Sequence, residues 1–307
     1  MRVRPALVIG GLAWFAGSAS ARLVAAQELE PGAYEVAPTG VQVATVAYSY
    51  NDGDVGFDPA APIEDSRARI HNLVLSYGRS LNLFGRSGQI GVGAPFVVGS
   101  LQGRFRGDLL SGHRAGFADP RVRVAVNLYG APAMEGRAFR EHRGNTLMGL
   151  SLSLVLPFGE YESTRVINPG TNRWAFKPEA GLSHTVGRWK IEWYGGVWLF
   201  TTNTAFYGGR RREQQPIGET QLHVEYQLRR RIATTFNVNY YTGGRTTVDG
   251  QRNFDLQQNS RLGGTLTLPA GQRRGVRVAV SWGAYTTVGA AFTSVSTAYL
   301  YSWGGAP

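Results

Sequence analysis

Residues 219–228 read ETQLHVEYQL, and they divide into two different rows when alternate positions are separated. In a β-strand, successive side chains point to opposite faces. One row of this stretch is mostly apolar and consists of Thr220, Leu222, Val224, Tyr226 and Leu228. The other row is entirely polar and consists of Glu219, Gln221, His223, Glu225 and Gln227. The stretch therefore predicts a strand that presents an apolar face to one environment and a polar face to another.

The same period of two recurs along the chain, and this period is the signal of strands. Twelve segments show it, at about 41–50, 68–79, 88–99, 117–130, 145–157, 172–186, 189–202, 217–228, 232–242, 255–268, 275–285 and 291–303. Most approach the length of roughly 9–11 residues that a tilted strand needs to cross a bilayer. An even strand number is typical of bacterial single-chain barrels. The sequence predicts an all-β fold, a closed antiparallel up-and-down transmembrane β-barrel of about twelve strands over residues 41–303, with a short tail at 304–307.

A soluble β-sandwich would also show alternation, so the composition of the two faces has to separate the classes. A solvated sheet face usually carries many charges and lysines, whereas the polar rows here favour Gly, Ser, Thr, Asn and Gln. The apolar rows also end in aromatic residues, namely Trp174, Trp189, Trp193, Tyr226, Tyr240, Trp282 and Trp303. Aromatic residues at strand ends are typical of the two membrane interfaces. These features favour the membrane barrel.

The connections between the twelve segments alternate in length. Those after the first, third, fifth, seventh and ninth segments are long, and most of the others are short, down to Gly187–Arg188. The connection after 117–130 is a long exception, and the last one is short. Long loops outside and short turns on the periplasmic side are the arrangement expected of an outer-membrane barrel.

The N-terminal region has the order of a secretory signal peptide. Two arginines precede a short apolar run and then small residues, so residues 1–26 are predicted to be a signal peptide cleaved after Ala21 or Ala26. Residues 27–40 are then a periplasmic segment or part of a plug. The chain has no cysteine, which excludes disulfides and thiolate metal sites. The predicted location is the outer membrane.

The formal net charge is +11, and arginine carries almost all of the positive charge because Lys177 and Lys190 are the only lysines. Nucleic acid is disfavoured as a partner, because the arginines are scattered and the chain is predicted to be exported. Outer-membrane lipid, lipopolysaccharide and small solutes are the expected partners. The predicted outer loops contain Arg104, Arg106, Arg114 and Arg210 to Arg212, which suit either lipopolysaccharide phosphates or ordinary solubility.

The polar rows predict a set of lumen-lining residues. They are Arg121, Arg123, Lys177, Glu179, Lys190, Glu192, Glu219, Gln221, His223, Glu225, Arg261 and Arg277. Opposite charges in a narrow lumen are expected to satisfy one another, because a lone buried charge is costly. The set leans positive, so an anion preference is the working hypothesis.

No catalytic, cofactor-binding or metal-ligating residues are predicted. The five histidines are scattered and lack a metal-binding spacing. No G-x-S-x-G is present, and the stretch IGVGAP lacks the third glycine of a dinucleotide loop. Asp52, Asp54 and Asp58 are interpreted as a solvated acidic loop, since the EF-hand pattern is absent.

One block resembles a known family. Residues 156–203 contain Pro157-x-Gly159 with Tyr161, then Asn168-x-Gly170-Thr171-Asn172-x-Trp174, Phe176-Lys177-Pro178, Gly181, Gly187-x-Trp189 and Thr202-Asn203. Together with Gly116-Phe-Ala-Asp119-Pro120, these features resemble the outer-membrane family named for the meta-pathway of phenol degradation. The resemblance covers residues 68–303, and it implies an outer-membrane β-barrel with a role in uptake and no catalytic residues.

Three functional classes follow from these observations. The first is a passive pore or transporter for small solutes. The second is a membrane-embedded hydrolase that uses a carboxylate with a histidine, although no nucleophile motif is present. The third is a structural barrel with adhesive loops. We expect the first and expect no enzyme activity, and the sequence assigns neither the solute nor the oligomeric state.

Overall fold

The computed structural model describes residues 29–55, 64–105, 108–142, 144–165 and 167–305. The predicted signal peptide at 1–26, Arg106 and Asp58 lie outside these residues. Among the residues described, no helix is long and apolar enough to cross a membrane.

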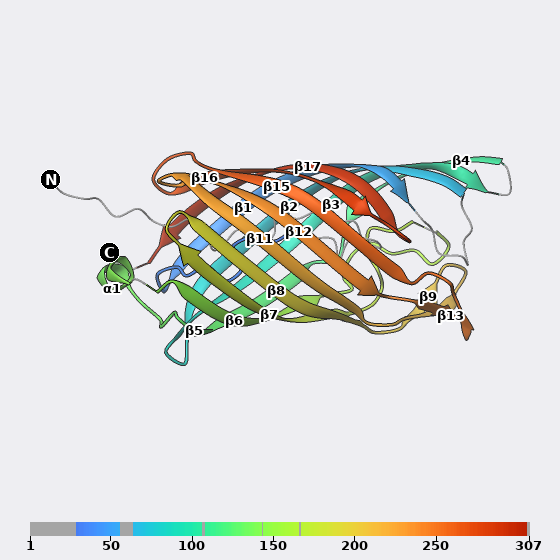
Figure 1. Ribbon diagram of the computed structural model, residues 1–307. Coiled ribbons are helices and arrows are strands. Elements are labelled where there is room, and N and C mark those ends of the chain that lie inside the picture. The colour runs from blue at the N-terminus through green and yellow to red at the C-terminus, as the bar shows by residue number, and fades with distance from the viewer. Residues whose placement is uncertain (1–28, 56–63, 106–107, 143, 166, 306–307) are drawn as a thin grey trace.

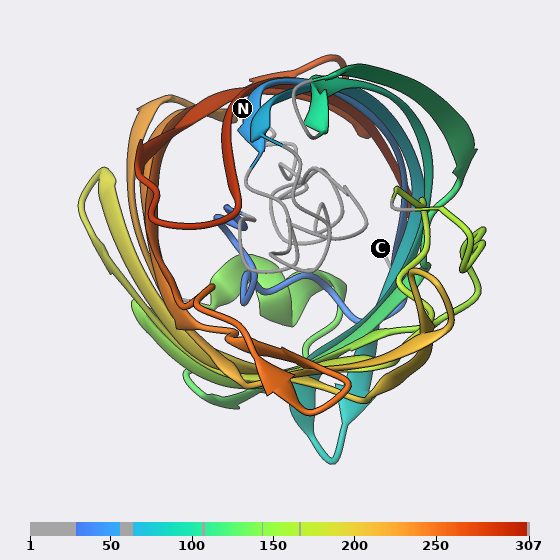
Figure 2. The ribbon, with the colours of Figure 1, turned by 90° about the vertical axis from the view of Figure 1, so that its right-hand side faces the viewer.

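The strands form one closed antiparallel barrel with twelve strand positions (Figures 1 and 2). Its strands are β1 (Val41–Val55), β2 (Glu64–Leu83), β3 (Arg86–Phe105), β4 (Asp108–Phe117), β5 (Arg121–Tyr129), β6 (Thr146–Val155), β7 (Ala175–Val186), β8 (Trp189–Phe200), β11 (Ile217–Arg229), β12 (Ile232–Gly243), β15 (Gln257–Pro269), β16 (Arg274–Tyr285) and β17 (Ala290–Gly304). The circle closes between β1 and β17, where Val41 pairs with Gly304. The prediction of a closed barrel of about twelve strands is confirmed.

β4 and β5 together occupy one position, because both pair with β3. The sequence predicts a single strand over residues 117–130, and the structure interrupts it at residues 118–120. Pro120 has no backbone N–H to donate to a ladder, which explains a break at this point. Beyond the break, β4 continues the same path outward to Asp108.

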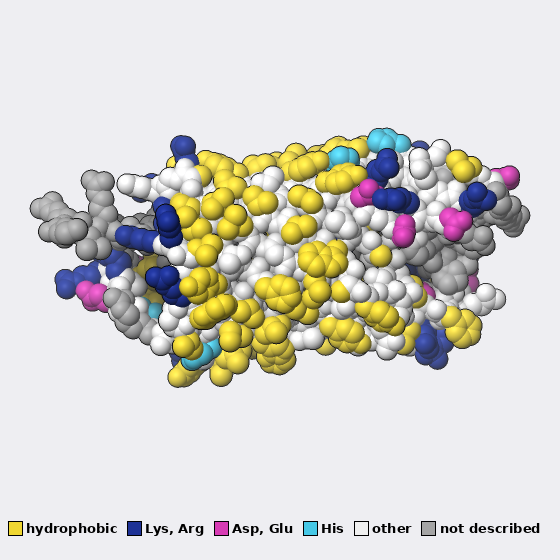
Figure 3. All heavy atoms as spheres, turned by 45° about the horizontal axis from the view of Figure 1, so that its top comes forward, with side chains coloured by type: hydrophobic (Ala, Val, Ile, Leu, Met, Phe, Trp, Pro, Cys, Tyr) yellow, Lys and Arg dark blue, Asp and Glu magenta, His cyan; other side chains and the backbone are white. Residues whose placement is uncertain are grey.

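The two faces of the wall follow the alternation in the sequence. On β11, Gln221 and His223 are 1% and 0% exposed, whereas Leu222 and Leu228 are 41% and 44% exposed. The pattern is the reverse of a soluble protein, because the polar row is inside and the apolar row outside. Figure 3 shows the resulting apolar surface along the barrel.

The two ends of the barrel differ. We call the end where β1 begins and β17 ends the proximal end; it carries short turns and α1 (Gly136–Glu141) (Figure 1). Phe84 and Gly85 form one of these turns with φ of 53° and 79°, as a two-residue hairpin loop of type I′ requires. At the opposite, distal end, a second sheet contains β9 (Asn203–Phe206), β10 (Arg210–Gln214), β13 (Thr246–Val248) and β14 (Gln251–Arg252).

Candidate functional site in the barrel interior

The predicted lumen residues lie on the inner side of the wall. Arg123, Lys177, Glu179, Glu192, Glu219, Gln221, His223 and Arg261 are buried, and Arg121, Lys190, Glu225 and Arg277 are half-buried. They come from β5, β7, β8, β11, β15 and β16. The structure joins most of them into two charged clusters, and both clusters involve the chain that precedes β1.

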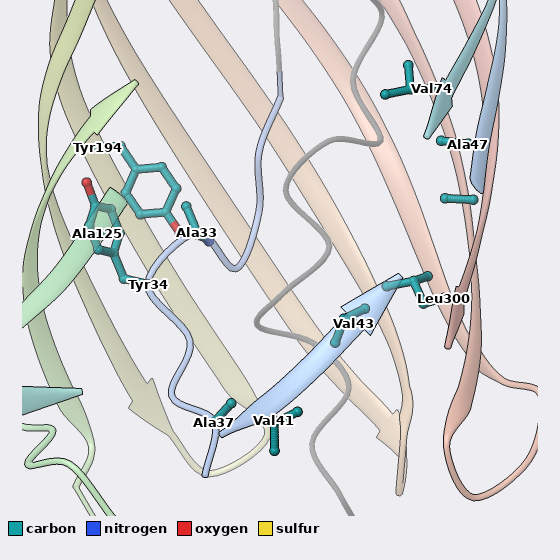
Figure 4. Packing of buried hydrophobic residues seen from close by; sticks show 11 residues of the cluster. Ala33, Tyr34, Ala37, Val41, Val43, Ala47, Val74, Ala125, Tyr194 and Leu300 are labelled. Atoms are coloured by element: carbon teal, nitrogen blue, oxygen red, sulfur yellow. Dashed lines mark hydrogen bonds between the residues drawn. The ribbon is translucent and has the colours of Figure 1, made fainter. Parts of the chain in front are cut away.

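Residues 29–40, which we call the inner segment, precede β1, and residues 30–35 of this segment contact side chains inside the barrel. Tyr34 is 1% exposed and packs edge-on against Tyr194, with ring centroids 5.2 Å apart (Figure 4). Its hydroxyl donates to Glu179 Oε1 at 3.1 Å and lies 3.1 Å from Ser151 Oγ. A tyrosine near the N-terminus is thereby held by side chains of β6, β7 and β8.

Two glycines provide the space for the Tyr34 ring. Gly149 of β6 and Gly181 of β7 are cross-strand neighbours. A Cβ atom at Gly149 would lie 2.3 Å from Tyr34 Cδ1, and one at Gly181 would lie 2.1 Å from Tyr34 Cε2. Since such distances are far below van der Waals contact, any side chain at either position would displace the ring.

The backbone of the inner segment is bound by wall side chains as well. Gly32 N–H donates to Glu192 Oε2 at 2.8 Å, and Ala33 N–H donates to Tyr194 Oη at 3.2 Å. From the other side, Arg123 Nη1 donates to Ala33 O at 3.1 Å. These bonds satisfy backbone groups that no sheet ladder serves.

The first charged cluster surrounds Glu179. Arg123 Nη2 lies 3.2 Å from Glu179 Oε1, and Lys177 Nζ lies 2.9 Å from Glu179 Oε2. Lys177 also lies 3.6 Å from Glu219 Oε2, which accepts a 2.9 Å hydrogen bond from Trp198 Nε1. Each buried charge therefore has an opposite charge beside it, as burial requires.

The second cluster surrounds Lys190. Its ammonium group lies 3.6 Å from Glu192 Oε1 and 3.3 Å from Glu225 Oε2, and it also forms an ion pair with Glu35 of the inner segment. Elsewhere in the interior, Arg121 Nη1 lies 3.3 Å from Glu30 Oε1. Two acidic side chains of the inner segment thus pair with basic side chains of the wall.

The inner segment changes the charge balance of the predicted lumen set. The predicted lumen set holds six basic residues and four glutamates. Glu30 and Glu35 raise the number of carboxylates beside these residues to six. With the inner segment in place, the formal charges of this group cancel.

Of the remaining predicted residues, His223 and Arg261 have neutral partners. His223 Nδ1 lies 2.7 Å from Asn237 Oδ1, and its Nε2 lies 3.1 Å from Gln221 Oε1. Arg261 donates to Ser281 Oγ at 2.8 Å and to Ser294 Oγ at 3.0 Å. Arg277 is half-buried on β16. Within the described part of the chain, no group of three His, Asp or Glu residues is arranged to hold a metal ion.

A second polar cluster lies at the distal end, between β4 and β5. Asp119 accepts hydrogen bonds from Gly159 N at 2.9 Å, Thr171 N at 2.7 Å and Thr171 Oγ1 at 2.6 Å. Asn203 Nδ2 donates to Tyr161 Oη at 3.0 Å and to Thr171 O at 3.1 Å. Burial raises the pKa of the Asp119 carboxyl, and these donors together with Arg173 partly offset the shift. These hydrogen bonds hold residues 156–174 against the barrel at the interruption between β4 and β5.

The arginines predicted on the outer loops lie on strands at the distal end, Arg104 on β3, Arg114 on β4 and Arg210 to Arg212 on β10, and most of those described have local partners. Arg114 pairs with Glu162 at 3.1 Å, and Arg211 pairs with Glu213 at 2.7 Å. Arg210 and Arg212 lie over the Phe206 ring, 5.7 and 5.3 Å from its centroid. The interpretation of Asp52 and Asp54 as loop residues is wrong, because both lie on β1 and pair with β2 and β17; Asp52 also forms an ion pair with Arg67 at 2.8 Å.

Several interior residues were missed from the sequence. Tyr194 and Trp198 are buried, and they share the parity of Lys190 and Glu192 on β8, so alternation alone predicts their inward direction. Tyr34 gave no such signal, because it precedes the first strand and its partner Ser151 lies 117 residues away.

Comparisons with known proteins agree with the fold. A family model described as "Putative MetA-pathway of phenol degradation" matches residues 65–301. The outer membrane channel COG4313 from Pseudomonas putida F1 is 18% identical with a TM-score of 0.75, over 90% of this chain and all of that one. The β-domain of the Bordetella autotransporter BrkA is 12% identical with a TM-score of 0.53, over 86% of this chain and all of that one. No functionally curated protein matches the sequence significantly.

Proposed function

The chain belongs to the family described as "Putative MetA-pathway of phenol degradation", and we propose that it is an outer-membrane channel that passes small solutes through its polar interior. The observation that carries this proposal is the closed wall with apolar side chains outside and polar side chains inside. A closed barrel satisfies every backbone hydrogen bond within lipid. Polar solutes can then cross the membrane through the polar interior of the barrel, whereas the hydrocarbon of the bilayer excludes them.

The proposed orientation places the proximal end in the periplasm, because short turns are typical of that side. In this account, residues 1–26 are removed after Ala21 or Ala26 during export. The chain that follows would then enter the barrel from the periplasmic end, where β1 begins.

We further propose that the inner segment is a plug. The support is the set of bonds that residues 30–35 make with β5, β7, β8 and β11, together with the fit of Tyr34 against Gly149 and Gly181. Residues 38–40 contact the proximal rim instead, where Gly40 N–H donates to Ser80 O at 3.1 Å. A chain that loses residues 27–35 would therefore keep its attachment to β1 and lose the plug.

The proposed arginine bias applies to the unplugged interior. Without Glu30 and Glu35, the predicted lumen set holds six basic residues and four glutamates, which favours anions. We therefore propose that the solute is a small neutral or anionic molecule.

The hydrolase and adhesin alternatives are less well supported. Glu179, Glu192 and Glu219 lie in ion pairs, and His223 is engaged by Asn237 and Gln221, so these groups satisfy one another. Binding of lipopolysaccharide by the loop arginines is a weaker proposal, because Arg114 and Arg211 already have acidic partners.

A liposome swelling assay tests the channel function. The chain from residue 27 and a chain that begins at Val36 are refolded into vesicles and exposed to neutral, anionic and cationic solutes of matched size. We expect fast swelling with the shorter chain and slow swelling with the longer one. With the shorter chain, swelling should be faster in neutral and anionic solutes than in cationic solutes. Folded barrels that admit no solute in either form would refute the channel.

A further inference from the structure

The proximal end carries an unusual concentration of arginine. Its short turns join β2 to β3, β7 to β8, β11 to β12 and β15 to β16, and each has exposed arginines at or beside it. We define the arginine rim as Arg86, Arg188, Arg229, Arg230, Arg273 and Arg274. These turns lie around the circle of the wall, and Figure 3 shows basic side chains at this end, on the left, directly beside the apolar surface.

The positive charge of the rim is weakly compensated. Arg86, Arg188, Arg229, Arg273 and Arg274 form no ion pair with any other described residue. The connections at this end contain only two acidic residues in the described part, Glu135 and Glu141, and Glu141 already pairs with Arg137 at 2.7 Å. In the turn after β11, burial and the neighbouring charge of Arg230 lower the pKa of Arg231.

The distal end has a different arrangement. There, several basic residues are paired with carboxylates, as in the pairs of Arg67 with Asp52, Arg114 with Glu162 and Arg211 with Glu213, whereas Arg104 and Arg252 form no ion pair with another described residue. Arginines without an ion pair are therefore more concentrated at the proximal end, where Arg86, Arg188, Arg229, Arg273 and Arg274 have none among the described residues, and the overall charge of +11 does not by itself explain this difference.

The rim lies next to an aromatic boundary. Arg188 directly precedes Trp189, whose ring centroid is 4.6 Å from that of Tyr226. Arg274 pairs across strands with Tyr301, which stacks on Trp303 at 5.7 Å. Tyr226 precedes Arg229 by three residues, which is about 10 Å of strand. Aromatic residues of a barrel lie at the membrane interface, so the guanidinium groups reach the depth of the lipid headgroups.

At this depth, guanidinium groups lie beside the phosphate groups of the lipids. The planar fork of arginine binds phosphate oxygens through two parallel hydrogen bonds, and arginine is weakly hydrated compared with lysine. Basic clusters beside a membrane attract anionic lipids. We propose that the arginine rim is a binding surface for the phosphate groups of anionic phospholipids in the leaflet around the proximal end.

In the proposed orientation this is the periplasmic leaflet. The rim would hold the barrel at a fixed depth and collect anionic phospholipid around it. If the rim instead bound an acidic protein partner, the barrel would show no preference among lipids.

The test measures lipid selectivity with spin-labelled lipids at the barrel surface. The chain from residue 27 is reconstituted in phosphatidylcholine with labelled phosphatidylglycerol or labelled phosphatidylcholine. The rim variant carries Arg229→Gln, Arg230→Gln, Arg273→Gln and Arg274→Gln. The control variant removes the same charge at the distal end, with Arg69→Gln, Arg104→Gln, Arg211→Gln and Arg252→Gln.

We expect the unmodified chain to prefer phosphatidylglycerol by at least about twofold, as a cluster of basic residues at a membrane surface predicts. The preference should fall to near one in the rim variant, persist in the control, and vanish in high salt, which screens charge. A chain without the preference, a rim variant that retains it, or a control that loses it equally would overturn the proposal. If the rim variant fails to fold, the salt titration of the unmodified chain and the double variant Arg273→Gln, Arg274→Gln decide the question.

Discussion

Tyr34 holds the inner segment through two features that depend on different neighbours. The ring needs Gly149 and Gly181 to lack side chains, and the hydroxyl needs Glu179 and Ser151 as partners. The two contributions can therefore be separated by substitution.

Tyr34→Phe tests the hydroxyl. A hydrogen bond to a charged group such as the Glu179 carboxylate contributes about 1.5–3 kcal/mol, and about 1.4 kcal/mol is a tenfold change in an equilibrium. We expect the open fraction in single-channel recordings to rise about tenfold. The control is Tyr240→Phe on the outer face, where Tyr240 is 41% exposed. An unchanged open fraction in Tyr34→Phe would show that this hydroxyl does not hold the segment.

Gly181→Ala tests the fit of the ring. The new methyl group would overlap Tyr34 Cε2, so we expect the segment to be displaced and the conductance to rise. Gly264→Ala is the matched control, because nothing lies within 4 Å of a Cβ atom there. Equal conductance in the two variants would contradict the proposed position of Tyr34.

At the scale of single elements, β11 shows what alternation predicts. The burial of its residues follows the alternation in the sequence, because the period of two is local to the strand. The contacts of the inner segment could not be predicted in this way, since Gly32 and Glu192 are 160 residues apart. The residues around Asp119 were recognised as family motifs, but their mutual hydrogen bonds join positions 40 to 52 residues apart.

A charged substitution on the outward face of β11 is expected to destabilise the barrel by an amount that depends on its depth in the bilayer. Leu222 lies near the middle of this strand, and Arg on a lipid face near the bilayer midplane costs about 2–4 kcal/mol, falling to about 0–1 near the interface. We expect Leu222→Arg to lower the unfolding free energy in vesicles by that larger amount. Leu109→Arg, on the exposed distal strand β4, should have a small effect. Equal losses would show that Leu222 does not face lipid.

The position of the loop at residues 156–174 depends on hydrogen bonds to the carboxylate of Asp119. In Asp119→Asn, an amide N–H₂ group would face the N–H of Gly159 or of Thr171, so one of these hydrogen bonds would be lost. Because a hydrogen bond to a charged group contributes about 1.5–3 kcal/mol, we expect trypsin to cleave after Arg165 at least about tenfold faster. Asp108→Asn is the control, since Asp108 is exposed. An unchanged cleavage rate would show that Asp119 does not restrain the loop.

At the scale of the whole molecule, the predicted lumen set and the two glutamates of the inner segment have opposite formal charge. The wall supplies the basic excess of the predicted lumen set, and Glu30 and Glu35 offset it. The sequence predicted the basic excess from the strand rows. It did not predict the cancellation, because both glutamates precede the first strand.

Single-channel conductance and reversal potential under a salt gradient test this account most directly. The chain from residue 27 is compared with the chain that begins at Val36, both refolded and inserted in a planar bilayer. We expect the longer chain to be nearly silent and the shorter chain to give discrete steps with an anion-favouring reversal potential. A shorter chain that folds and stays silent, or one that favours cations, would contradict the proposal that the inner segment plugs an arginine-biased channel.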